Sequence, residues 1–178
     1  CMAIGYLYTG GPIPISWTPF GELFSGLFMG MIIILLAFFI QTGNVNGFVV
    51  WISLPIVITI GLINMANNIR DRVKDKASGR KTLPILLGKK ASITFMAAMY
   101  ILAYLIVIFT ALFKSGGSLF YLLVLFSFPM PIKAIRRFNK NDTPASMMPA
   151  MAATGKTNTI FGILYALGIY ISALLGGI

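Results

Sequence analysis

In residues 48–84, FVVWISLPIVITIGLINMANNIRDRVKDKASGRKTLP, an apolar run passes directly into a polar one. A helix needs about 20 apolar residues to cross the hydrocarbon core, and residues 48–66 meet that length. A helix also satisfies its own backbone polar groups where lipid offers no partner. We therefore interpret this stretch as a transmembrane helix that leaves the membrane and continues into a polar loop.

Other segments of the chain have the same length and apolar character. The sequence therefore predicts an all-α, multi-pass transmembrane helical bundle with about five spans. The composition agrees, because 58% of the residues are hydrophobic and only 10% are charged, far from the values of soluble domains. We treat residues 1–178 as a single transmembrane domain. The expected spans are residues 22–40, 48–66, 94–113, 119–135 and 159–178.

The charged residues indicate how the bundle lies in the membrane. Lys and Arg number 14 against four acids, which gives a formal net charge of +10. With the exception of Lys114, the basic residues fall in or beside the two longer connections, residues 67–93 and 133–158. By the positive-inside rule this face is cytoplasmic, so the charge indicates topology and not a nucleic-acid partner. The C-terminus, Ile178, then lies on the opposite side.

Two absences limit the chemistry. Cys1 is the only cysteine and there is no histidine, which excludes a disulfide framework, a zinc finger and a His-based catalytic site. Cys1 also stands where an initiator Met would be expected. We therefore expect the chain to be an N-terminally truncated fragment.

The polar end of the second predicted span carries a candidate site on one face. At about 100° per residue, Asn67, Asn68, Asp71 and Asp75 fall within an arc of about 100°, with Asn64 inside it. Carboxylates four residues apart repel each other on a helix, and a divalent cation between them would reverse that effect. Oxygen ligands without His or Cys suit Mg²⁺, which completes its shell with water and substrate phosphates.

Basic residues surround these acids, and Arg80 and Lys81 follow directly after Gly79. Such a mixture suits a diphosphate, neutralised by metal on one side and by guanidinium or ammonium groups on the other. The alternative is a solvated helix end whose Asp and Lys side chains pair with each other. The spacing alone leaves both interpretations open.

Three stretches together carry a resemblance to a known family. NNIRDRVKDKASGRKTLPILLGKK, residues 67–90, resembles the second aspartate-rich motif of the UbiA superfamily of intramembrane prenyltransferases. Residues 5–30 and 147–168 are similar to the corresponding parts of its 1,4-dihydroxy-2-naphthoate branch, which serves menaquinone synthesis. The family has nine helices around a cavity that opens toward the cytoplasm, and this chain resembles the last five. The first aspartate-rich motif of the family, of the NDxxD kind, is absent, so we expect the chain alone to be inactive.

The resemblance implies a Mg²⁺-dependent transfer of a polyprenyl group from its diphosphate to an aromatic acid, within the plasma membrane of a prokaryote. It assigns metal-binding and catalytic roles to Asp71 and Asp75. It implies roles for further residues as follows: diphosphate binding for Asn67, Asn68, Arg80 and Lys81, aromatic-substrate binding for Tyr6, Tyr8 and Thr9, and a place at the cavity mouth for Lys156 and Asn158.

Several alternatives remain at this stage. Tyr6 and Tyr8 equally fit an interfacial aromatic belt, and Lys156 fits a snorkelling lysine that sets topology. Another acceptor, such as 4-hydroxybenzoate, is compatible with the superfamily, although YTGGPIPI lacks the basic pair typical of that branch. Outside enzymes, the chain could be a transport or membrane-anchor subunit. Transport is disfavoured because the charges stay at one face and do not line several helices at membrane depth.

Overall fold

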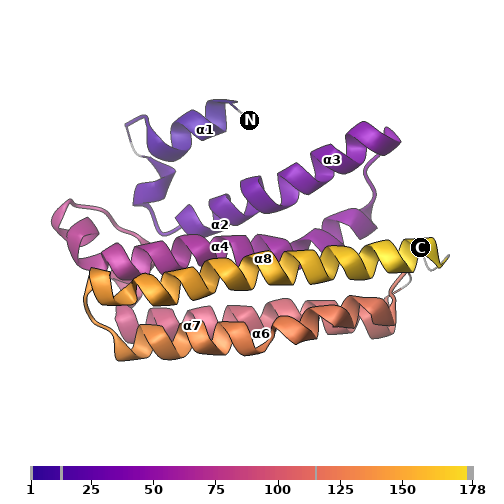
Figure 1. Ribbon diagram of the computed structural model, residues 1–178. Coiled ribbons are helices and arrows are strands. Elements are labelled where there is room, and N and C mark those ends of the chain that lie inside the picture. The colour runs from indigo at the N-terminus through magenta and orange to yellow at the C-terminus, as the bar shows by residue number, and fades with distance from the viewer. Residues whose placement is uncertain (1, 13, 115, 176–178) are drawn as a thin grey trace.

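The chain folds as a bundle of helices that lie side by side, as Figure 1 shows. The computed structural model describes residues 2–12, 14–114 and 116–175, and within these ranges every regular element is a helix. The three longest are α4 (Gly47–Ala77), α6 (Lys89–Phe113) and α8 (Pro144–Leu174). The other α-helices are α1 (Met2–Thr9), α2 (Gly21–Gly26), α3 (Ile33–Thr42), α5 (Leu83–Leu87) and α7 (Pro129–Lys140). Two 3₁₀ helices, η1 (Ile15–Trp17) and η3 (Leu119–Ser127), and a π-helix, η2 (Leu27–Ile32), complete the set.

Five helical stretches among the described residues are long and apolar enough to cross a membrane. Three of them are α4, α6 and α8, and the other two are composite. The first runs through α2, η2 and α3 as Gly21–Thr42, and the fourth runs through η3 and α7 as Leu119–Lys140. These helices confirm the predicted all-α, multi-pass fold. The chain is an integral membrane protein.

The basic segment 133–158, expected to be a connection between spans, is almost entirely helical. Only residues 141–143 separate α7 from α8. Helix α8 begins at Pro144 because the hydroxyl of Thr143 accepts the backbone N–H of Ser146, while the Ser146 hydroxyl accepts that of Thr143. The prediction of a long loop is wrong because basic residues mark the membrane surface and not the end of a helix. The last residues of the fifth expected span, 176–178, lie outside the described residues.

The helix type of the fourth span changes at its prolines. Helix η3 ends at Ser127, and the α-helical turns of α7 begin at Pro129. Proline is tolerated in the first turn of a helix because its missing N–H would have no intrahelical partner there. The prolines therefore divide the span into a 3₁₀ part and an α-helical part.

Helices α2 and α4 approach each other unusually closely through glycines. A Cβ atom added at Gly26 would lie 2.3 Å from the carbonyl oxygen of Val57. One added at Gly61 would lie 2.9 Å from the carbonyl oxygen of Glu22. Small residues permit such backbone contact between membrane helices. As a result, α2 holds Glu22 directly against α4.

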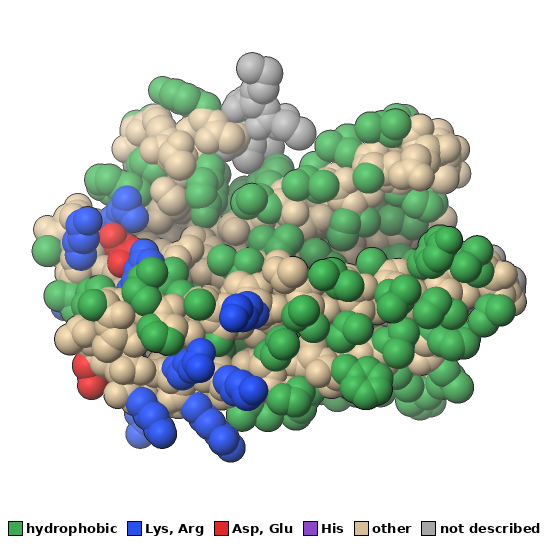
Figure 2. Space-filling model, in the orientation of Figure 1, with side chains coloured by type: hydrophobic (Ala, Val, Ile, Leu, Met, Phe, Trp, Pro, Cys, Tyr) green, Lys and Arg blue, Asp and Glu red, His purple; other side chains and the backbone are tan. Residues whose placement is uncertain are grey.

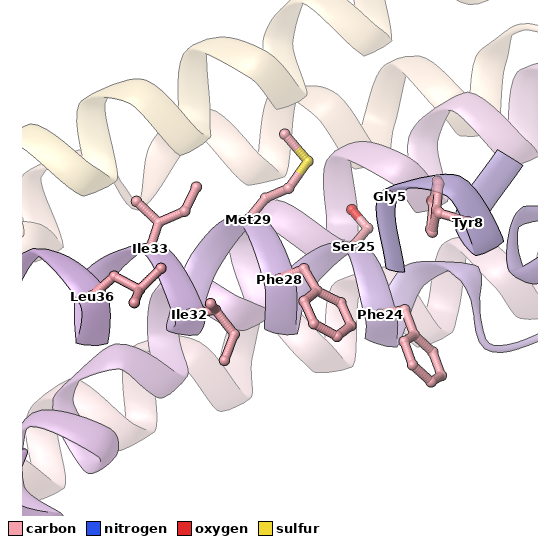
Figure 3. A pocket seen from close by; sticks show the side chains of 9 residues that line it. All are labelled: Gly5, Tyr8, Phe24, Ser25, Phe28, Met29, Ile32, Ile33 and Leu36. Carbon is pink, nitrogen blue, oxygen red and sulfur yellow. The ribbon is translucent and has the colours of Figure 1, made fainter. Parts of the chain in front are cut away.

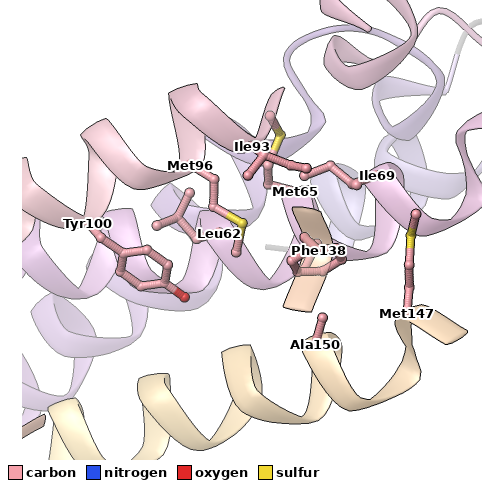
Figure 4. Packing of buried hydrophobic residues seen from close by; sticks show 10 residues of the cluster. Leu62, Met65, Ile69, Ile93, Met96, Tyr100, Phe138, Met147 and Ala150 are labelled. Atoms are coloured by element: carbon pink, nitrogen blue, oxygen red, sulfur yellow. The ribbon is translucent and has the colours of Figure 1, made fainter. Parts of the chain in front are cut away.

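A cluster of buried apolar residues supports the polar end of α4 from behind, as Figure 4 shows. Met65 and Ile69 of α4 pack with Met96 of α6, Phe138 of α7 and Ala150 of α8, and each is at most 2% exposed. The core thus fixes the rotation of α4, so that its Asn and Asp residues face away from this cluster.

The charged side chains gather at one end of the bundle. On the face drawn in Figure 2 they cover the end where α4 finishes and α8 begins, whereas the opposite end is mainly hydrophobic. Many large apolar side chains along the remaining helices are exposed, including Phe39, Phe109 and Leu167. This distribution suits a bundle with a lipid-facing surface and one strongly basic end.

Candidate functional site

The C-terminal half of α4 presents a continuous polar face. The helix runs without interruption to Ala77, so Asn64, Asn68, Asp71 and Asp75 all lie on it. These residues are three or four positions apart, which places them one above another on the same side. The structure therefore brings the predicted amides and carboxylates together on one helix. Asn67 lies beside them and is partly buried.

Each carboxylate on this face has a guanidinium partner. Asp71 accepts hydrogen bonds from Arg70, with 2.8 Å between Nε and Oδ1 and a second contact from Nη2. Asp75 is only 7% exposed, and its Oδ1 lies 3.4 Å from Nη1 of Arg80. A nearby positive charge stabilises the ionised form of a carboxylate. The hydrogen bonds from Arg70 accordingly lower the pKa of Asp71.

The carboxylates on this face fit Mg²⁺ better than a metal ion that takes all of its ligands from the protein. Among the described residues, no group of three or more His, Cys, Asp or Glu side chains is placed to hold a metal ion. Asp71 and Asp75 supply only two carboxylates, one helical turn apart. Mg²⁺ commonly uses one or two carboxylates and takes its remaining ligands from water and substrate phosphates.

The loop after α4 returns toward the start of the first span. Gly79 adopts a φ of +80°, a value that favours glycine, and this turns the chain at the helix end. The guanidinium of Arg80 stacks over the ring of Trp17 at 5.6 Å, and the Lys81 N–H donates to the Trp17 carbonyl oxygen at 2.8 Å. Arg80 is thereby fixed beside Asp75, whereas Lys81 is exposed.

Tyr8 is the one member of the predicted aromatic-substrate group that reaches this face. Its hydroxyl accepts a hydrogen bond from Nδ2 of Asn64 at 3.1 Å and donates to the Gly21 carbonyl oxygen at 3.4 Å. Partial burial raises the pKa of the Tyr8 hydroxyl, and the charge of Glu22 adds to that effect. Tyr6 is 66% exposed and Thr9 is exposed as well, and within the described part of the chain neither side chain forms a hydrogen bond to α4.

Glu22 is a site residue that the sequence analysis did not assign. Its Oε1 accepts a hydrogen bond of 2.9 Å from Nδ2 of Asn68, and both side chains are buried. The available signal was a carboxylate at the start of an apolar span, since an ionisable residue at such a position usually has a function. Its partner could not be identified from the sequence because 46 positions separate the two residues.

The two predicted cavity-mouth residues lie on α8 and differ in their surroundings. Lys156 is exposed, whereas Asn158 is partly buried. The Oδ1 atom of Asn158 is buried without a hydrogen-bond partner among the described residues. Although α8 packs against α4, no hydrogen bond joins either residue to Asp71 or Asp75 in this part of the chain. The structure therefore does not bring these two residues to the carboxylates.

An apolar groove begins at Tyr8 and follows the first span, as Figure 3 shows. It has a volume of about 300 Å³. Phe24 lies at the same end as Tyr8, Phe28 and Met29 lie in the middle, and Leu36 lies at the far end. The groove thus runs from the tyrosine that contacts the polar face of α4 along an exposed apolar side of the first span. Such a shape fits a long hydrocarbon chain attached to a polar head.

Sequence comparisons identify known proteins to which the chain is similar. The chain matches the UbiA prenyltransferase family over residues 1–160. It is 50% identical over 172 residues to 1,4-dihydroxy-2-naphthoate octaprenyltransferase of Bacillus subtilis (strain 168), covering 96% of this chain and 55% of that protein. It is 32% identical over 164 residues to the UbiA prenyltransferase domain-containing protein 1 homolog of Drosophila melanogaster, covering 92% of this chain and 44% of that protein.

A human relative, UbiA prenyltransferase domain-containing protein 1, is 27% identical over 167 residues, covering 94% of this chain and 47% of that protein. The chain spans about half the length of these relatives. The matched region holds the polar face of α4 and all the residues that contact it. Because the family match extends over most of the sequence, the chain belongs to the UbiA prenyltransferase family.

Proposed function

We propose that the protein containing this chain transfers a polyprenyl group from its diphosphate to 1,4-dihydroxy-2-naphthoate in a Mg²⁺-dependent reaction. The observation that supports this most is the 50% identity, over 96% of the chain, to a naphthoate octaprenyltransferase. In the proposed reaction, the bond between the allylic carbon and the diphosphate oxygen breaks, and a new bond forms to the naphthoate ring. The ring carbon loses its carboxyl group as CO₂, and the electron pair of that bond returns to the ring.

The roles proposed for individual residues follow from their charge and position. Asp71 and Asp75 hold Mg²⁺, which neutralises the departing diphosphate when it is bound. Arg80 is already fixed beside Asp75 and contributes positive charge to the same leaving group, and Lys81 adds a mobile ammonium. Asn67 lies at the edge of this face and can donate to a diphosphate oxygen.

The proposed active face is cytoplasmic, in the plasma membrane of a prokaryote. The carboxylates lie at the end of the bundle where the basic residues gather, as Figure 2 shows for one face. Cytoplasmic membrane surfaces carry an excess of Lys and Arg. A diphosphate substrate would then approach from the cytoplasm while its hydrocarbon chain remains in the bilayer.

The direct test is prenyl transfer in membranes that contain the complete protein of which this chain is part. Dihydroxynaphthoate and 4-hydroxybenzoate are offered separately with a polyprenyl diphosphate, with Mg²⁺ and with EDTA. We expect product from the naphthoate only, and only with Mg²⁺. Product from the hydroxybenzoate alone would contradict the acceptor, and product in EDTA would contradict the metal. No product from either ring would favour a membrane-anchor role.

The groove leads to a prediction about the length of the prenyl chain. Ser25 lines the groove between Tyr8 and Phe28. Replacing Ser25 with tryptophan should block the groove at this point and shift the preferred donor toward shorter prenyl diphosphates. Competition between two donors of different length measures the shift, and Ser25→Ala, which keeps the groove open, is the control. An unchanged preference in Ser25→Trp would show that the hydrocarbon chain lies elsewhere.

A further inference from the structure

We infer that Glu22 is a positioning residue that locks the side-chain amide of Asn68, so that its carbonyl oxygen faces the Asp71 and Asp75 carboxylates. This inference rests on the proposed function, because it concerns the same cation site. Asn68 would then not donate a hydrogen bond to the diphosphate. Its amide oxygen would instead bind the cation, either directly or through a water molecule.

The first argument is the direction of the hydrogen bond. Nδ2 of Asn68 donates to Oε1 of Glu22 at 2.9 Å. The amide nitrogen of Asn68 is therefore the end of the side chain that lies against Glu22, and an amide nitrogen can only donate. The carbonyl oxygen is left for a partner on another side.

The second argument is the side from which Glu22 approaches. The backbone of Glu22 lies against Gly61, where an added Cβ atom would be 2.9 Å from the Glu22 carbonyl oxygen. Gly61 lies two turns before Asn68 on α4, whereas Asp71 and Asp75 lie after it. The backbone of Glu22 thus packs against the part of α4 that precedes Asn68. The inference places the carbonyl oxygen of Asn68 on the side of the two aspartates, and an amide oxygen is a ligand that Mg²⁺ accepts.

The third argument is that Glu22 is costly to bury. Its side chain is 8% exposed, and its Oε2 is buried without a hydrogen-bond partner among the described residues. A buried carboxylate with one oxygen unbonded lowers stability. A buried carboxylate in contact with the polar face of α4 therefore points to a role in function. Residues that orient metal ligands from behind commonly change metal affinity about 10- to 100-fold when they are replaced.

The test measures Mn²⁺ binding to the complete purified protein by electron paramagnetic resonance, which does not depend on turnover. Glu22→Leu should weaken Mn²⁺ binding at least about tenfold. Glu22→Gln should stay near wild type, because its amide oxygen can still accept from Asn68. Asp142→Ala removes an 86% exposed carboxylate outside the site and serves as the control, with unchanged binding expected.

A second substitution distinguishes positioning from general damage. In the Glu22→Leu background, Asn68→Asp should restore Mn²⁺ binding, because either oxygen of the new carboxylate can face the cation. Thermal unfolding of each variant shows that the protein remains folded. Unchanged Mn²⁺ affinity in folded Glu22→Leu would overturn the inference, as would a loss that Asn68→Asp fails to restore. A wild-type protein without Mn²⁺ binding would instead overturn the metal site of the proposed function.

Discussion

Replacing Asp71 with alanine is expected to reduce prenyl transfer by the complete protein at least about 100-fold. Asp71 is one third exposed on the polar face of α4 and is held as an anion by Arg70. Without it, the proposed cation site retains only one carboxylate, and Arg70 loses its partner. The loss should appear in kcat at saturating prenyl diphosphate and Mg²⁺. Initial rates in membranes, normalised to the amount of protein, measure it.

Asp142→Ala is the matched control for this substitution. Asp142 lies between α7 and α8, also at the basic end of the bundle, and forms a 2.6 Å ion pair with Lys89. Exposed ion pairs contribute little to stability, about 0–1 kcal/mol, so we expect nearly unchanged kcat. Equal losses in the two variants would mean that acidic charge at this end matters generally. Wild-type activity in Asp71→Ala would refute the proposed role of Asp71.

Replacing Gly26 with alanine is expected to lower the free energy of unfolding by about 1–3 kcal/mol. The new methyl group would lie 2.3 Å from the Val57 carbonyl oxygen, so α2 must move away from α4. Alanine favours a helix over glycine by about 1 kcal/mol, but this gain does not offset a backbone clash. Because Glu22 is on α2, its hydrogen bond to Asn68 should also be lost. Thermal unfolding in detergent and Mn²⁺ binding measure the two effects.

Gly162→Ala provides the comparison because, among the described residues, no side chain and no other helix lies within 4 Å of a Cβ atom added at that glycine. This substitution in α8 should leave stability unchanged or raise it by about 0.4–1 kcal/mol. The difference in stability between the two Gly→Ala variants separates the effect of the α2–α4 contact from the general effect of placing alanine in a helix. If both variants unfolded at the same temperature as wild type, the tight contact at Gly26 would be absent from the folded protein.

Much of the polar face could be predicted from the sequence because it is local. Asn67, Asn68, Asp71 and Asp75 belong to one helix, and helical spacing alone places them on one side. The sequence analysis was wrong about residues 133–158. There α7 ends and α8 begins around residues 141–143, well before the expected fifth span. There the sequence analysis followed charge, whereas Thr143 and Pro144 were the signals that mark the helix start.

Contacts between helices could not be predicted in the same way. Tyr8 and Thr9 are adjacent in the sequence, yet only Tyr8 reaches Asn64. Glu22 reaches Asn68 because glycines at positions 26 and 61 let α2 lie against α4. Such partners depend on how two helices cross, and apolar periodicity does not record that geometry.

The sequence by itself therefore determined that the chain is a multi-pass helical membrane protein with amides and carboxylates on one helix face. These properties follow from hydrophobic length, charge and helical period, each of which acts over a few neighbouring residues. The packing of the helices adds that Arg80 stacks on Trp17, that Tyr8 contacts Asn64 and that Glu22 accepts a hydrogen bond from Asn68. The physical reason is that these contacts join residues 46 to 63 positions apart, which only the close packing of separate helices brings together.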